Sequence, residues 1–367
     1  MSDRQPRIHY LPEDARVFVQ VRANIGDSLF ALPAIDALRQ RYPQARIVFA
    51  TSPAAGSLFY DDPRLSGWVP AIPYGGGRLR YARALRDYWS RLRKEGFDAH
   101  VELDAGGKVP PWIVWLAGVP LRLGCRGEEG GGGRWHAVPR WLLTDTVPVP
   151  DSLGLHRAHG FLRLMELLDC DPTPRPIRLL LTEERRERAR QRLEGLGLRP
   201  PVVAIHPGAS WRFRRWPAER VVETARQLAK DGAHLLALGG EADAEVVSEL
   251  VKAAGATAIL TPNVRDLVDL LSAVDVCVGN DSGPVHLAAA VGTAVVGLYG
   301  PNLATYTGPD PLHRRARVLS AQLPCAPCAQ GMIDPLAECK RPQGAWCMEQ
   351  IEVSDVLQAV RDLLSGS

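Results

Sequence analysis

The chain alternates between short apolar runs of strand length and longer stretches with helical spacing. The clearest example is the apolar run at residues 274 to 278, which a glycine-containing turn follows. Ser282 is a favourable N-cap and Pro284 a favourable first-turn residue, so we expect a helix to begin there. Gly292 ends this helix, and residues 293 to 300 predict the next buried strand. The segment is therefore typical of one βαβ unit.

The same alternation extends through both halves of the chain. Strands are expected in the first half at residues 17–21, 47–50 and 97–103, and in the second half at 202–206, 234–238 and 258–261. Helical periodicity occupies residues 28–42, 218–231 and 264–273. Strands that alternate with helices predict an α/β fold of doubly wound, Rossmann-like sheets.

The length of the chain and a proline-rich segment near its middle predict two domains. A chain of 367 residues exceeds the usual size of one domain. Prolines at 172, 174 and 176 precede a charged helix at 182–196, so the boundary is expected in the 170s to 190s. We place an N-terminal domain at residues 1–180 and a C-terminal domain at 181–350.

Charge and hydropathy restrict the partners and the location. The net charge of +3 is too small to indicate nucleic acid. No apolar run reaches transmembrane length and the N-terminus has no apolar signal core, so we expect a cytoplasmic protein that meets any membrane-linked substrate from that side. An arginine-rich helix after residue 77 is a solvated face or a basic patch for an anionic acceptor or the membrane. The four glycines at 130–133 form either a substrate lid or a bare surface loop.

The turn at 279–286 has the features of an anion site. A glycine turn that leads into a helix presents free amides and the positive end of the helix dipole. An acid at the end of the preceding strand, Asp281, can reach sugar hydroxyls. An ordinary βαβ turn is the alternative. The candidate donor-binding residues here are Asp281, Ser282, Gly283, Pro284, Val285 and His286.

The loop after the strand at 202–206 carries further candidates. It contains His206, Gly208 and three arginines, Arg212, Arg214 and Arg215, close to a predicted helix N-terminus. They form either a pyrophosphate clamp or a solvated basic loop.

Two acids follow other strands. Glu241 comes after the strand at 234–238, where it can bind ribose hydroxyls or favour the first turn of a helix. Asp27 comes after the first strand, where it can act as a general base or only cap a helix. The sequence alone leaves both alternatives open.

Three segments together resemble the glycosyltransferase family that contains the ADP-heptose:lipopolysaccharide heptosyltransferases. The first is the DSGxxHLxAA segment at 281–290, the second is Gly26, Asp27 and Pro33 in a GDxxxxxP segment, and the third is the PGA segment followed by basic residues before Trp216 and Pro217. The resemblance implies a GT-B fold, in which two Rossmann-like domains face each other across a cleft. It also implies that Asp27 is the general base and that Arg214 replaces a lysine that contacts the donor phosphate.

The implied activity is inverting transfer of heptose from ADP-heptose to a hydroxyl of a lipopolysaccharide-core, glycan or protein acceptor. Catalysis in this family needs no metal or other cofactor. Alternatives are another nucleotide-sugar donor, or a non-catalytic protein that binds sugar nucleotides; the presence of Asp27 argues against the latter. The GT-B fold also implies that the closing helix, residues 354–364, packs back on the N-terminal domain.

Four cysteines form a cluster with the spacing C-x2-C-x10-C-x7-C in a loop rich in Pro and Gly at 325–347. Four thiolates suit a structural zinc or iron ion, and disulfides are less suited to a cytoplasmic chain. A branch of the family that glycosylates autotransporter proteins holds iron in such a cysteine finger. The candidate ligands are Cys325, Cys328, Cys339 and Cys347.

Overall fold

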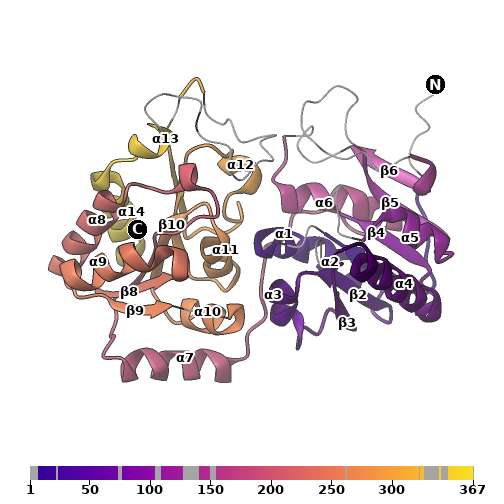
Figure 1. The fold of residues 1–367 in the computed structure, drawn as a ribbon, viewed down its shortest axis with the longest axis horizontal. Helices are drawn as coiled ribbons and strands as arrows, with labels where there is room; N and C mark the ends of the chain where they lie inside the picture. The colour runs from indigo at the N-terminus through magenta and orange to yellow at the C-terminus, as the bar shows by residue number, and fades with distance from the viewer. Residues whose placement is uncertain are drawn as a thin grey trace. The chain divides into compact units, whose positions relative to one another are not determined.

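A computed structural model describes residues 7–21, 24–72, 77–103, 109–126, 140–148, 154–260, 263–321, 323–325, 339 and 346–366. The chain divides into two compact units, Met1–Ile177 and Arg178–Ser367 (Figure 1). The sequence had placed this division three residues later, after residue 180. The glycines at 130–133 lie outside the described residues.

The first unit contains a parallel sheet of six strands in the order β3-β2-β1-β4-β5-β6. The chain starts in the middle of the sheet, builds one side, and then returns to build the other, so the strand order reverses between β1 and β4. This is the point at which doubly wound sheets bind ligands, beyond the carboxyl ends of the strands. The strands are β1 Arg16–Gln20, β2 Arg46–Thr51, β3 Gly67–Pro70, β4 Ala99–Glu102, β5 Leu121–Arg126 and β6 Asp145–Pro148.

Helices cover the sheet of the first unit. The single helix expected at 28–42 is two, because Pro33 lies in the first turn of a second helix that begins at Leu32. One face of the sheet packs through Phe18 and Val48 on a core that includes Tyr88 and Leu92. The helical segments are α1 Ile25–Phe30, α2 Leu32–Arg41, α3 Pro53–Gly56, η1 Ser57–Phe59, α4 Arg78–Glu95, α5 Pro111–Leu116, η2 Arg140–Leu142, α6 Arg157–Met165 and η4 Glu166–Leu168.

The second unit repeats the design with the order β12-β11-β10-β7-β8-β9, again parallel. Its order reverses between β10 and β7, the two strands that precede the predicted donor loops. The strand β12 was not predicted from the sequence. The strands are β7 Val202–His206, β8 His234–Gly239, β9 Thr257–Leu260, β10 Val276–Asn280, β11 Ala294–Tyr299 and β12 Ala316–Ser320.

The helices of the second unit begin where the sequence places capping residues. Thr182 caps α7 by accepting a hydrogen bond from the Arg185 amide at 3.3 Å. The segments are α7 Glu183–Gly195, η5 Arg212–Arg214, α8 Ala218–Lys230, η6 Glu241–Asp243, α9 Ala244–Ala254, α10 Val264–Leu271, α11 Gly283–Ala290, α12 Ala304–Thr307, α13 Trp346–Glu349 and α14 Val353–Ser365. In the described part of the chain, no helix combines the length and the apolar character that a membrane span requires.

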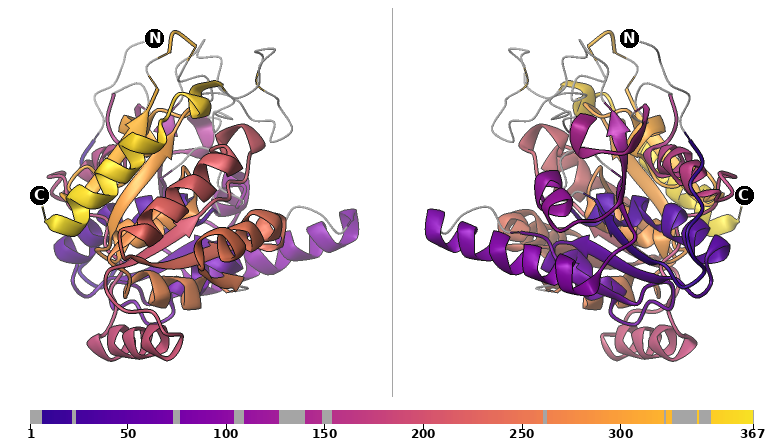
Figure 2. Two further views of the ribbon diagram at one scale, coloured as in Figure 1. Left: turned by 90° about the vertical axis from the view of Figure 1, so that its left-hand side faces the viewer. Right: turned by 90° about the vertical axis from the view of Figure 1, so that its right-hand side faces the viewer.

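The closing helix α14 corrects one prediction. It packs on α8 and on β10, β11 and β12 of the second unit, and Figure 2 shows it in yellow beside them. Val356, Val360 and Leu363 are spaced at helical intervals and are buried in the core of that unit. Because this apolar face is covered there, the expectation that the helix returns to the N-terminal domain is wrong.

Candidate functional site

The candidate site of the second unit is built where β7 and β10 end. The last residue of β10, Asn280, is buried and ties the two strand ends together. Its Nδ2 donates to the Pro207 carbonyl at 2.7 Å, and its Oδ1 accepts from the Trp216 amide at 3.0 Å. Asn280 therefore holds the loop after β7 against β10. From the sequence, Asn280 is expected only as part of a turn.

Gly208 lies against the side chain of Asp243, the last residue of η6 in the turn after β8. A Cβ atom at this position would lie 2.5 Å from Oδ2 of Asp243, and such a distance is sterically excluded. The Asp243 carboxylate is buried, accepts from the Gly240 amide at 3.1 Å and pairs with Nη2 of Arg215 at 3.3 Å. Asp243 thus connects the β8 turn to the arginine loop. It was missed, although its spacing of three residues from Gly240 is that of a capping carboxylate.

The three arginines of the loop have different environments. Nη1 of Arg214 lies 3.3 Å from Oδ2 of Asp281, and its guanidinium stacks 4.2 Å from the centre of the Trp211 ring. Arg215 is paired with Asp243, as described above. Arg212 is exposed, and no described carboxylate pairs with it. Arg214 is therefore paired with Asp281, Arg215 holds the loop through Asp243, and Arg212 is exposed to solvent.

Asp281 is the centre of this group. Burial by itself raises the pKa of this carboxyl, but the nearby His286 and Arg214 and the amide of Asn302 hold the pKa below its ordinary value. Nε2 of His286 is 3.6 Å from Oδ1, and Nδ2 of Asn302 donates to Oδ2. Asp281 is therefore a carboxylate in a buried polar network, suited to accept hydrogen bonds from hydroxyl groups. Asn302 was not predicted.

Helix α11 begins as predicted, but its cap differs. Ser282 occupies the N-cap position, yet its hydroxyl donates to the Asn280 carbonyl at 3.0 Å and makes no capping bond to the helix. Its oxygen is also 3.4 Å from Nδ1 of His206, whose pKa burial lowers to about 4, so this imidazole is neutral at physiological pH. The first-turn amides of Gly283, Val285 and His286 have no cap from the Ser282 side chain and can bind an anion, whereas Pro284 has no N–H to donate.

Glu241 is exposed in the first turn of η6, at the carboxyl end of β8. This position keeps it a candidate for hydroxyl binding, beside the buried Asp243. The assignment of Glu241 to hydroxyl binding stays a prediction.

In the first unit, Asp27 lies in the first turn of α1 and is nearly buried. Nη1 of Arg157, at the start of α6, is 2.7 Å from Oδ1, and Nδ2 of Asn24 donates to Oδ2 at 3.0 Å. Two partners thus fix the orientation of the carboxylate, and its role as a general base stays a prediction. Arg157 was missed because 130 residues separate it from Asp27 and nothing in the sequence connects the two.

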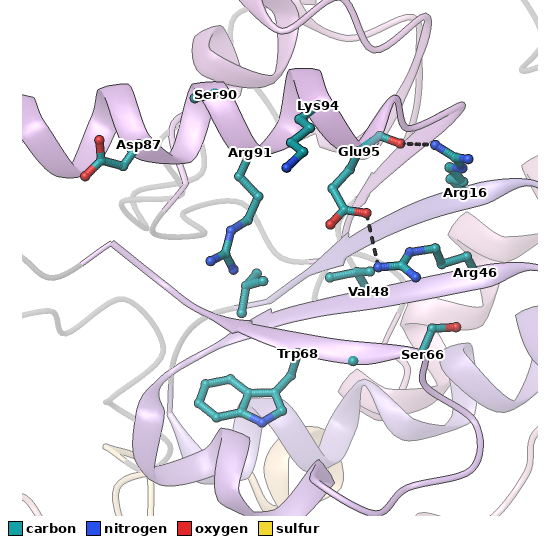
Figure 3. A pocket seen from close by; sticks show the side chains of 12 residues that line it. Arg16, Arg46, Val48, Ser66, Trp68, Asp87, Ser90, Arg91, Lys94 and Glu95 are labelled. Atoms are coloured by element: carbon teal, nitrogen blue, oxygen red, sulfur yellow. Dashed lines mark hydrogen bonds and ion pairs between the residues drawn. The ribbon is translucent and has the colours of Figure 1, made fainter.

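A hollow of about 760 Å³ in the first unit lies away from these residues (Figure 3). Arg16 and Arg46, the first residues of β1 and β2, line it, and the last turns of α4 cover it. Glu95 joins the two sides, because its side chain pairs with Arg46 at 3.1 Å and its carbonyl accepts from Arg16. The hollow is therefore at the amino ends of the strands, opposite to the end where doubly wound sheets bind ligands.

The cysteine cluster is only partly described. Cys325 is exposed and Cys347 is buried against Gly300, while Cys328 lies outside the described residues. Within the described part, no three His, Cys, Asp or Glu side chains are gathered as a metal site. The four-cysteine metal site stays a prediction.

Two doubly wound parallel sheets, with polar loops at the reversal of strand order, define an α/β protein of the class in which nucleotide-binding proteins are common. A family model for glycosyltransferase family 9 (heptosyltransferase) matches residues 85–334. Lipopolysaccharide heptosyltransferase 2 of Salmonella typhimurium is 30% identical over 311 residues, with 80% of this chain and 85% of that protein covered. The Escherichia coli protein of the same name is 28% identical over 322 residues. The chain therefore belongs to glycosyltransferase family 9.

Solved structures support the same fold. The chain matches E. coli ADP-heptose lps heptosyltransferase II with a TM-score of 0.74 and 22% identity, covering 96% of this chain and 99% of that one. It matches E. coli heptosyltransferase WaaC with ADP with a TM-score of 0.70 and 15% identity, covering 95% and 99%. The predicted α/β fold with two Rossmann-like GT-B domains is confirmed.

Proposed function

We propose that this glycosyltransferase moves heptose from ADP-heptose to a hydroxyl of a lipopolysaccharide-core acceptor, with inversion at the anomeric carbon. The observation that carries the proposal is the group around Asp281. The buried Asp281 carboxylate and its partner Arg214 lie beside the α11 amides. The carboxylate can accept hydrogen bonds from sugar hydroxyls, and the arginine and the amides can donate hydrogen bonds to a diphosphate. The family and the names of its relatives support heptose as the sugar.

The chemistry requires a proton acceptor and compensation of charge. We assign the first role to Asp27, which takes the proton of the acceptor hydroxyl as oxygen attacks the anomeric carbon. The bond to the diphosphate breaks, and ADP leaves with the electron pair. The α11 amides with Arg214 stabilise the developing negative charge, and we propose that no metal ion takes part. Asp281 and Glu241 bind hydroxyl groups of the donor.

The experiment is incubation with ADP-heptose and a core acceptor that lacks the terminal heptose. We expect release of ADP that requires the acceptor, together with a mass increase of the acceptor by one heptose. Transfer from another nucleotide sugar alone would change the donor assignment, because a fold does not determine its substrate. Binding of ADP-heptose without any release would support the non-catalytic alternative. A glycan or protein that gains heptose when the core acceptor does not would change the acceptor.

The location and the metal are also proposals. We place the enzyme in the cytoplasm, at the inner face of the membrane, where a lipid-linked acceptor is accessible. We further propose that Cys325, Cys328, Cys339 and Cys347 bind one structural zinc or iron ion. The donor set of four thiolates fits either metal. One structural relative, the bacterial glycosyltransferase TibC, contains iron; it matches with a TM-score of 0.60 and 14% identity.

A further inference from the structure

The first unit exposes an aromatic surface that the site does not use. On the short helix α5, Trp112 is 42%, Trp115 is 45% and Leu116 is 50% exposed, and on η2 Trp141 is 66% exposed. Large apolar side chains that gather on a surface generally mark an interaction site. The four side chains are called the tryptophan patch below.

The buried residues of α5 and η2 hold the tryptophan patch at the surface. Helix α5 buries Ile113 and Val114 in the core, which leaves its other side to solvent. Leu142, next to Trp141, is buried, and its carbonyl accepts from Nε of Arg122 at 2.6 Å. The rings of Trp115 and Trp141 meet edge to face, with centroids 5.8 Å apart. This ring contact joins the exposed apolar side chains of α5 to that of η2.

A strongly basic helix adjoins the tryptophan patch. Helix α4 carries seven basic and two acidic residues, a net charge of +5, and it packs beside α5 (Figure 1). Nε1 of Trp89 on α4 donates to the Leu116 carbonyl at 3.2 Å, which places this side of α4 against the patch. Arg93 lies over the Trp89 ring at 5.5 Å, and Arg86, three residues before Trp89, lies on the same side of the helix.

We propose that α4, α5 and η2 form a docking surface for an anionic lipid bilayer. Tryptophan rings favour the headgroup layer, where one edge is apolar and the other is wet, and adjacent arginines are attracted by anionic lipids. The positive charge beside the rings favours a bilayer over an uncharged partner. The proposal deepens the proposed function, since it assigns the surface through which a membrane-borne acceptor is reached.

Helix α4 supplies a matched control. Arg91 and Lys94 are exposed on its other side and line the hollow of Figure 3. The pairs Arg86→Gln/Arg93→Gln and Arg91→Gln/Lys94→Gln therefore remove equal charge from one helix, either beside the tryptophan patch or away from it. Tyr60→Ser removes a ring that is 76% exposed outside α4, α5 and η2, and it is the control for Trp115→Ser/Trp141→Ser.

The experiment is flotation of the full chain with vesicles of phosphatidylglycerol and phosphatidylethanolamine, compared with phosphatidylcholine vesicles. We expect binding to the anionic vesicles that weakens as salt increases. The Arg86/Arg93 pair should lower partitioning by roughly twenty-five-fold, about fivefold for each arginine. The tryptophan pair should lower it by about tenfold or more. The Arg91/Lys94 pair and Tyr60→Ser should have much smaller effects.

Several results would overturn the proposal. The first is that the protein does not float with anionic vesicles. The second is that the two charge-pair variants lose vesicle binding to the same extent. The third is that the tryptophan variant floats as well as the wild type. Light scattering that shows a dimer which the tryptophan variant abolishes, without vesicle binding, would identify a protein interface instead. Thermal melting establishes that each variant is folded. Transfer to a soluble core fragment is measured separately, so the proposed function and the docking surface can fail independently.

Discussion

At the scale of single residues, each unit contains a nearly buried carboxylate that an arginine holds. Asp27 is paired with Arg157 from α6, and Asp281 is paired with Arg214 from the loop after β7. Removal of one partner of a buried ion pair leaves an uncompensated charge and costs about 3–5 kcal/mol of folding free energy. The chemical roles of these residues should therefore be tested with substitutions that keep shape or charge, and stability should be measured in each variant.

Asp27→Asn tests the general base. The amide retains the shape of the side chain but cannot accept the proton, so we expect turnover to fall by about 10²-fold or more while donor affinity stays nearly unchanged. Steady-state kinetics and calorimetry with ADP measure the two quantities. Asp36→Asn is the matched control, because Asp36 is also paired with an arginine, Arg64, in the same unit. Near-normal turnover of Asp27→Asn would remove the assignment.

Arg214→Ala tests the donor contact. Loss of a charged donor should weaken ADP binding by about tenfold or more in calorimetry, with a smaller change for the acceptor. Arg214→Lys keeps the charge and should recover part of the affinity. Arg212→Ala, at an exposed arginine, should have less effect. If ADP affinity is unchanged in Arg214→Ala and falls in Arg212→Ala or Arg215→Ala, the phosphate contact belongs to that other arginine.

At the scale of elements, strand β4 contains a titratable group in the core. His100 is fully buried, stacks on Phe18, and burial lowers its pKa from 6.5 to about 3. Between these values the unfolded chain binds a proton that the folded chain does not, so stability falls as the pH decreases. The slope contributed by His100 is up to about 1.4 kcal/mol per pH unit.

His100→Leu should remove this slope. The free energy of unfolding of the first unit should then change less between neutral pH and about pH 5 than in the wild type. Urea unfolding at the two pH values is the measurement. His206, whose pKa is lowered to about 4, contributes acid sensitivity to the second unit, so it serves as an internal reference. An unchanged pH dependence of the first unit in His100→Leu would contradict the prediction.

Metal binding by the cysteine segment between β12 and α14 can also be tested at this scale. If it binds a structural metal, Cys328→Ser should lower the melting temperature strongly and chelation should do the same. Elemental analysis of protein purified without added metal should give about one zinc or iron per chain. Absorbance separates the two metals, because a ferric thiolate site is coloured. Cys170→Ala, a buried thiol outside the cluster, should leave the metal content unchanged. A metal-free protein with full activity would overturn the site.

Elements were predictable where local residues determine them. Thr182 and the Ser282–Pro284 turn marked helix starts correctly, and Gly292, with φ of 92°, ends α11 as expected. The side chain of Ser282 was not predictable, because its hydroxyl bonds to the Asn280 carbonyl and lies beside His206. The break near Pro33 was missed because the apolar periodicity continues through it.

At the scale of the whole molecule, the sequence indicated two Rossmann-like domains but not every pairing between distant segments. The fold could be predicted because strands and helices alternate along the sequence. The contacts of Asp27 with Arg157 and of Gly208 with Asp243 could not be predicted, because they form only when distant segments are brought together by folding. The closing helix was misplaced for the same reason. Its apolar face predicts burial, but nothing in its sequence says which domain covers it.

The division of the chain predicts a separation of binding from transfer. The second unit has its own core, which includes α14, and the candidate donor-binding residues all lie between His206 and His286. A fragment of residues 178–367 should therefore fold alone and bind ADP within about threefold of the full-chain affinity, but catalyse no transfer, because Asp27 belongs to the first unit. Calorimetry and the transfer assay measure the two properties, and a fragment of residues 1–177 is the control that should not bind ADP. A folded 178–367 fragment without ADP affinity would show that donor binding requires the first unit.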